Sequence, residues 1–168
     1  MELWVLRVLH ISSGAFWAGT AMFMGFFLIP AIVEAGPGGG AVMNGVMKRK
    51  FQVAINAAAF ICALSGVRLY MLSFSGAWLA TGTGIAYSLG AVFAVGSLVI
   101  SVGFTKPVST RMSALADTIA AGGLPPTPEQ ISAMQGFGAR LKKLGKVNAF
   151  HLLGAALSMA AGRYFPMA

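Results

Sequence analysis

Long runs of apolar residues, separated by shorter polar stretches, dominate the pattern of this chain. Four runs are long enough to cross a bilayer, at roughly 3–30, 51–73, 84–105 and 145–165, since about 20 apolar residues suffice in a helix. Backbone polar groups in lipid must be hydrogen-bonded within their own segment, so each run predicts a helix. We therefore predict an all-α integral membrane four-helix bundle with up-down-up-down order, forming one domain over residues 1–168.

Composition supports this prediction, because 57% of the residues are hydrophobic, 10% are charged and the mean hydropathy is +0.79. A soluble globular domain is less apolar. The first run does not resemble a cleavable signal peptide, since Glu2 replaces the usual basic start and the run is too long. We expect this span to remain in the mature protein.

The stretches between the runs predict two loops. Glycine and proline in residues 34–45 predict a loop or hinge. Residues 106–143 predict a cytoplasmic loop with short helices, the first of which could be amphipathic and lie on the membrane surface. The favoured alternative is a solvated hairpin that only connects two spans. The sequence GGLPP would end that helix, and Thr127 with Gln130 predicts a capping box at the start of the next one.

The net charge of +8 is distributed unevenly along the chain. In the up-down-up-down order, the first and third loops share one side of the membrane and carry Lys48, Arg49, Lys50, Lys106, Arg111, Arg140, Lys142, Lys143 and Lys146. The other side carries Arg7, Arg68 and Arg163. The positive-inside rule makes the first side cytoplasmic and places both termini outside. The charge thus indicates topology and contact with lipid rather than binding of nucleic acid.

Both histidines of the chain lie inside predicted spans, where ionisable residues are rare and usually functional. Small residues follow each histidine at helical spacing, namely Gly14, Ala18, Ala21 and Gly25 after His10, and Ala155, Ser158 and Gly162 after His151. Such a stripe can accept a neighbouring helix or a flat ligand.

Imidazole beside small residues is typical of b-type haem sites between helices. His10 and His151 are therefore candidate axial ligands, with Gly14 as a position where the ring would approach the backbone. At about 1.5 Å per residue, His10 lies roughly 10 Å and His151 roughly 20 Å below the outer edge. This offset leaves open whether they share one iron, and a homodimer is expected if they bind different haems.

Three arginines near the outer face are candidate partners for the haem propionates, as guanidinium–carboxylate pairs. They are Arg7, Arg68 and Arg163, and Glu2 is the only acidic residue on that side. At least two of the three therefore lack a carboxylate partner within the chain. The alternative is that they extend to lipid phosphates.

Two other functions compete with haem binding. Ten methionines with two histidines suggest copper handling or transport, because thioether and imidazole bind Cu(I). The chain could instead be a non-catalytic partner subunit whose small-residue stripes only dock helices. Cys62, the only cysteine, lies in mid-span and is interpreted as a core residue.

The first span, LHISSGAFWAGTAMFMGFFLIPAI, resembles that of small bacterial membrane proteins related to copper-resistance D-type proteins, to urate oxidase membrane domains and to HemJ-type protoporphyrinogen oxidases. The closing AGRYF and the PPTPEQ loop look most like a four-span branch of that group. The resemblance implies haem ligation by His10. It does not extend to protoporphyrinogen oxidation, because the His–Lys pair of the HemJ-type third span is absent from Gly84 to Phe104.

Together these patterns predict a haem b protein of the bacterial cytoplasmic membrane. It would transfer electrons from a donor such as quinol to an acceptor near the outer face. The sequence leaves open whether the protein is an enzyme, such as a membrane haem oxidoreductase.

Overall fold

The computed structural model describes residues 1–165, and the described part is all-helical, with no strand. The prediction of an all-α fold is confirmed. In chain order the helices are α1 (Glu2–Phe23), η1 (Met24–Leu28), α2 (Ile29–Glu34), α3 (Pro37–Lys48), α4 (Phe51–Ser73), α5 (Gly76–Leu79), α6 (Gly82–Val99), η2 (Ile100–Thr105), α7 (Lys106–Gly122) and α8 (Pro128–Gly162).

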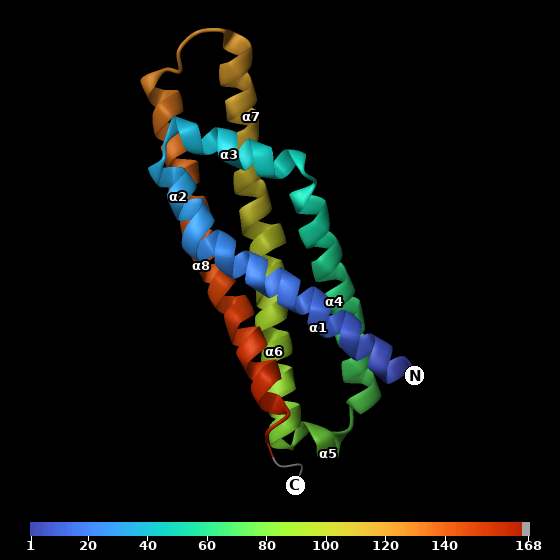
Figure 1. The fold of residues 1–168 in the computed structure, drawn as a ribbon. Helices are drawn as coiled ribbons and strands as arrows, with labels where there is room; N and C mark the ends of the chain where they lie inside the picture. Colours follow the sequence, from blue (N-terminus) through green and yellow to red (C-terminus); the bar gives the residue numbers. More distant parts are fainter. Residues whose placement is uncertain (166–168) are drawn as a thin grey trace.

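The long helices alternate in direction, and two contacts define one end of the bundle. Arg68 of α4 forms an ion pair with Glu2 at 2.8 Å, and the hydroxyl of Thr83 donates to the Phe165 carbonyl at 3.4 Å. At the other end, Lys142 of α8 lies 3.3 Å from the Glu34 carboxylate. Helix α1 crosses diagonally from α4 to α8, while α6 and α8 run side by side (Figure 1).

Within the described residues, three helical segments are long and apolar enough to cross a membrane: Glu2–Glu34, Phe51–Ser73 and Gly82–Gly122. They contain the first three predicted spans, and the second has the predicted bounds. Most of the predicted fourth span, residues 145–162, lies in α8, which is not among the three. Lys146, Asn148 and His151 lower the hydropathy of its apolar half.

Prolines inside two long helices explain their π-helical segments. Pro30 follows η1 and Pro107 follows η2, each two residues after the segment ends. A proline ring would clash with the carbonyl four residues earlier. The wider π turn avoids this clash, with hydrogen bonds from Ile29 N–H to Met24 O and from Lys106 N–H to Ser101 O. Both helices therefore continue past their prolines.

The predicted loop at residues 34–45 is wrong in its extent, because most of it is helix α3. The break is confined to Ala35 and Gly36, and Gly36 has a φ of +59°. Gly39 allows the new helix to lie directly against the Ile32 carbonyl, where any side chain would clash. Helix α3 then runs crosswise to the long helices and leads to α4, while the α7–α8 hairpin extends beyond it (Figure 1).

Residues 106–143 form the helical hairpin that the sequence favoured, but its helices are longer than predicted and are continuous with their neighbours. Helix α7 continues α6 instead of lying apart on a membrane surface, and it packs against α8 (Figure 1). Residues Gly136 and Gly138 do not interrupt α8. Gly123, with a φ of +62°, ends α7, which confirms the predicted break.

The predicted capping box at the start of α8 is confirmed. The Gln130 N–H donates to the Thr127 hydroxyl at 3.3 Å, and the Thr127 N–H donates to the Gln130 side chain at 2.9 Å. Hydrogen bonds from its own backbone and from Thr127 lower the pKa of the exposed Glu129 carboxyl. These bonds favour the folded helix at neutral pH and are lost as the pH falls through that lowered pKa.

The core lies where α1, α4 and α8 meet, around Trp17, Cys62 and Leu152. Small residues let the helices approach closely there, as is common in membrane bundles. A Cβ on Gly25 would overlap the Gly145 carbonyl oxygen and lie 3.0 Å from the Ala149 Cβ. Glycine at position 25 is therefore required for the contact between η1 and α8.

Replacing Gly25 by alanine should separate η1 from α8, because the added methyl group meets rigid backbone. We expect a loss of about 1–3 kcal/mol in the free energy of unfolding, measured by titration with sodium dodecyl sulfate. Gly19→Ala is the matched control, since a Cβ on Gly19 meets nothing within 4 Å. Equal midpoints for the two variants would contradict this account of the contact.

Candidate functional site

The His10 side chain lies between α1 and α4. Its Nδ1 is 2.9 Å from the Cys62 carbonyl oxygen and 3.5 Å from the Cys62 Sγ. The ring covers Gly66, where an added Cβ would come within 2.7 Å of Cε1. A glycine on α4 thus makes the space in which this imidazole sits.

The carbonyl contact determines the protonation pattern of the neutral His10 ring. A carbonyl oxygen only accepts hydrogen bonds, so Nδ1 carries the proton and donates to Cys62. Nε2 is then the nitrogen with the free electron pair. This is the arrangement in which protein histidines bind metals, with the other nitrogen donating to a carbonyl.

The small-residue stripe after His10 is covered by other helices. Gly14 faces α4, where an added Cβ would be 3.2 Å from the Cys62 Sγ, and Gly25 faces α8. Ala18 is buried in the core between them. The structure therefore uses this stripe for helix packing along the length where a flat ligand was the alternative.

His151 has a similar environment between α8 and α6. Its Nδ1 is 2.9 Å from the Val147 carbonyl oxygen, one turn earlier in α8. Its ring lies over Gly96, where an added Cβ would be 2.8 Å from Cδ2, and packs edge-on against Phe93 with centroids 6.0 Å apart. The stripe after it also faces α6, since an added Cβ on Gly162 would meet Tyr87.

The two imidazoles are held in different interfaces. His10 contacts α4, whereas His151 contacts α6. The part of the chain that the structure describes contains no cluster of three or more His, Cys, Asp or Glu side chains placed to hold a metal ion. The arrangement thus offers two separate imidazoles, each with its Nδ1 occupied by a carbonyl.

The three arginines have different surroundings. Arg7 is exposed on α1, one turn before His10. Arg68 forms the ion pair with Glu2, so its guanidinium is already partnered by a carboxylate. Arg163 follows the end of α8, with its guanidinium 5.4 Å from the centre of the Tyr164 ring.

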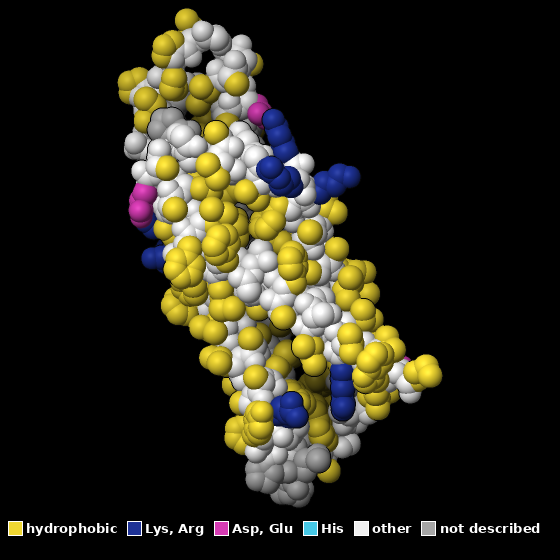
Figure 2. Space-filling view, viewed as in Figure 1, with side chains coloured by type: hydrophobic (Ala, Val, Ile, Leu, Met, Phe, Trp, Pro, Cys, Tyr) yellow, Lys and Arg dark blue, Asp and Glu magenta, His cyan; other side chains and the backbone are white. Residues whose placement is uncertain are grey.

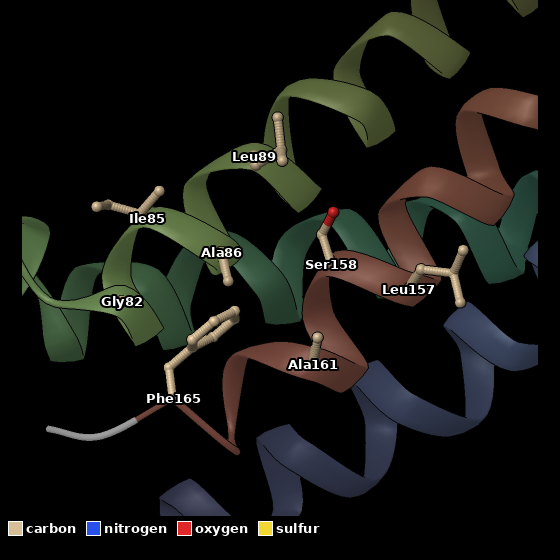
Figure 3. A pocket seen from close by; sticks show the side chains of 8 residues that line it. All are labelled: Gly82, Ile85, Ala86, Leu89, Leu157, Ser158, Ala161 and Phe165. Atoms are coloured by element: carbon tan, nitrogen blue, oxygen red, sulfur yellow. The ribbon is translucent and has the colours of Figure 1, made fainter.

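Two apolar grooves open on the surface of the bundle. The larger, about 510 Å³, lies between α6 and α8 near Phe165, whose ring faces Ala86 while Ser158 supplies a hydroxyl (Figure 3). The smaller, about 340 Å³, lies beside Tyr70 and Ser88. These two hydroxyls are hydrogen-bonded at 2.7 Å and join α4 to α6.

Sequence reasoning missed two contacts. The first is the approach of the Cys62 thiol to His10; Cys62 and Gly66 are four residues apart and therefore share a helix face, which was a usable signal. The second is the hydrogen bond from the Ser97 hydroxyl to Asn148 Oδ1 at 2.6 Å, with Ser97 fully buried. Ser97 follows Gly96, and Asn148 lies one turn before His151, so this bond fixes the register around that ring.

Compared with known proteins, the chain matches no family model, no curated protein and no solved structure. Its function is therefore inferred from the geometry of its own residues.

Replacing Ser97 by alanine should weaken the α6–α8 interface, because Asn148 loses its hydrogen-bond partner between the two helices. We expect the free energy of unfolding to fall by about 0.6–1.7 kcal/mol. It is measured by titrating the protein in detergent micelles with sodium dodecyl sulfate. The control is Ser101→Ala, which alters a partly exposed serine one turn further along the same helix. A loss of the same size in the control would show that the hydrogen bond to Asn148 is not the cause.

Proposed function

We propose that this chain is a four-span protein of the bacterial cytoplasmic membrane with both termini outside. The 35-residue α8 supports a fourth span, because it runs antiparallel to α6 and covers the same length of bundle. Nine basic residues precede or follow the spans at the Glu34–Lys142 end, against three at the other end. The positive-inside rule makes the first end cytoplasmic.

We further propose that the protein binds b-type haem through His10. One observation carries this proposal: the Nδ1 of His10 donates to a carbonyl inside an apolar span, which leaves Nε2 as an electron-pair donor. The resemblance of the first span to haem-binding membrane families favours the same ligand. Haem is preferred over other metals because it requires only one or two protein ligands.

Some of the predicted ligand and propionate-binding residues are placed to hold haem, and others are not. Arg7 would hold a propionate beside His10, and Arg163 is exposed at the same end, whereas Arg68 would first have to leave Glu2. His151 has the same Nδ1 arrangement but contacts a different helix, so it would serve a second haem. A homodimer that brings single ligands together is then the expected assembly.

Bound haem would supply a one-electron carrier between its ferric and ferrous states. The role of the chain would be to bind the haem iron through an imidazole and to keep each imidazole in one protonation pattern. We propose electron transfer from a membrane quinol to an acceptor near the outer face. The apolar groove between α6 and α8 supports a quinol donor, since such ligands bind in apolar recesses with few polar groups.

The visible spectrum of the protein purified after haem-replete expression tests the proposal. Wild type should show a Soret band. His10→Ala should lose the absorbance of the haem that His10 binds, whereas His151→Ala should retain that absorbance. Added imidazole should restore the band in His10→Gly, which separates lost ligation from misfolding. A colourless wild-type protein would refute haem binding, and loss of the whole band in either variant would show a shared iron.

Copper handling is a second candidate, favoured by the thiol of Cys62 at 3.5 Å from the Nδ1 of His10. A thiolate and an imidazole together suit Cu(I), although Nδ1 would have to leave the Cys62 carbonyl. Copper binding should then be lost in Cys62→Ser, whereas haem binding through Nε2 should survive it. Metal analysis and the visible spectrum of this one variant distinguish the two candidates. The third possibility, a non-catalytic subunit whose stripes only dock helices, is consistent with the helix packing of the stripe after His10. A wild-type protein that is both colourless and free of copper would favour it.

A further inference from the structure

Seven basic side chains surround one end of the bundle, and we call them the basic collar. They are Lys48, Arg49 and Lys50 between α3 and α4, Lys106 at the start of α7, and Lys142, Lys143 and Lys146 on α8. All are exposed except the half-buried Lys142. Figure 2 shows several basic side chains gathered where α3 meets α4, and another at the opposite edge of the view beside an acidic side chain near α2.

The collar lies at the depth where the helices would leave the hydrocarbon. At about 1.5 Å per residue, Lys106 is about 36 Å from the Gly82 end of its helix, and Lys143 is about 28 Å from the Gly162 end of α8. The hydrocarbon is about 30 Å thick, so both positions fall close to the lipid phosphates. Long lysine side chains can extend over the remaining distance.

Helix α3 gives a second, independent indication of a membrane surface. It lies crosswise at this end of the bundle rather than along it (Figure 1). It exposes Val42 and Met47 and ends in Lys48, followed by Arg49. Apolar and basic residues on a crosswise helix are typical of helices in the headgroup region.

The protein itself does little to neutralise the collar. Glu34 is paired with Lys142. Asp117 is about 16 Å along α7 from Lys106, and Glu129 is about 20 Å along α8 from Lys142. Among the described residues, the Lys142–Glu34 pair is the one ion pair that includes a collar side chain. The other collar cations are therefore available to negatively charged groups outside the chain.

We propose that the basic collar is a binding surface for the headgroups of anionic phospholipids such as phosphatidylglycerol. The phosphates would contact the collar lysines while the acyl chains lie along the apolar spans. A nucleic acid or an acidic protein would have to reach the collar past the headgroups, which already supply phosphate at this depth. This inference depends on membrane insertion but not on haem.

The test is thermal unfolding of the purified full-length chain in a neutral detergent, with added phosphatidylglycerol or phosphatidylcholine. Phosphatidylglycerol should raise Tm by a few degrees, because a ligand of the folded state stabilises it. Phosphatidylcholine should not. The shift should shrink in about 1 M salt, where the Debye length is about 3 Å.

Two triple variants assign the effect to the collar. Lys48→Gln with Lys143→Gln and Lys146→Gln should lose most of the shift, whereas the same three positions changed to Arg should keep it. If the first variant does not fold, the salt dependence of wild type decides. Equal shifts with both lipids, an undiminished shift in the Gln variant, or the same shift with inorganic phosphate alone would each overturn the proposal.

Discussion

Close approach of helix backbones at glycines is the constraint on which the structure depends. Lipid offers no hydrophobic force that pushes apolar helices together, so they associate through packing and through a few polar contacts. At Gly25 the η1 backbone touches the Gly145 carbonyl of α8, and at Gly66 and Gly96 the space left by a missing side chain holds an imidazole. The same kind of residue thus sets the helix spacing and receives the only two histidines.

The prolines have a less obvious consequence for the architecture. Pro30 and Pro107 would be expected to end their helices, but each is preceded by a π-helical turn that removes the steric clash. As a result α6, η2 and α7 form one helix of 41 residues. At about 1.5 Å per residue, this helix is longer than the hydrocarbon of a bilayer is thick, and its far end forms the hairpin with α8. The crosswise α3 arises in the same region, because only Ala35 and Gly36 separate it from α2.

The environment of the two histidines connects packing to chemistry. Each Nδ1 is held by a backbone carbonyl, from a different helix for His10 and from its own helix for His151. In the neutral ring this contact leaves the electron pair on Nε2. The two rings face α4 and α6, respectively, so a single iron between them would require the helices to rearrange. This geometry is why single ligation and assembly of two chains fit the proposed haem protein better than one shared iron.

The sequence by itself determined the helical class, the three helices long and apolar enough to cross a membrane, the α7 break at Gly123 and the cap at Thr127. Each of these depends on local properties: apolar length, glycine conformation and hydrogen bonds between residues three apart. It also identified the histidines, since two ionisable residues in apolar runs stand out. The extent of α3 and the continuous hairpin were missed, because contacts such as Gly39 with Ile32 override the low helix propensity of glycine.

Only the tertiary structure decided what faces each imidazole. The spacing of the small residues is the same whether a helix or a ligand covers them, so the stripe after His10 could not be assigned from sequence. Helix α1 and its continuation η1 follow a diagonal path across the bundle. At one end of this path His10 faces Cys62 and Gly66 of α4, and at the other end Gly25 of η1 faces α8. That path results from the shapes of three helices packing together, and no local pattern in the chain records it.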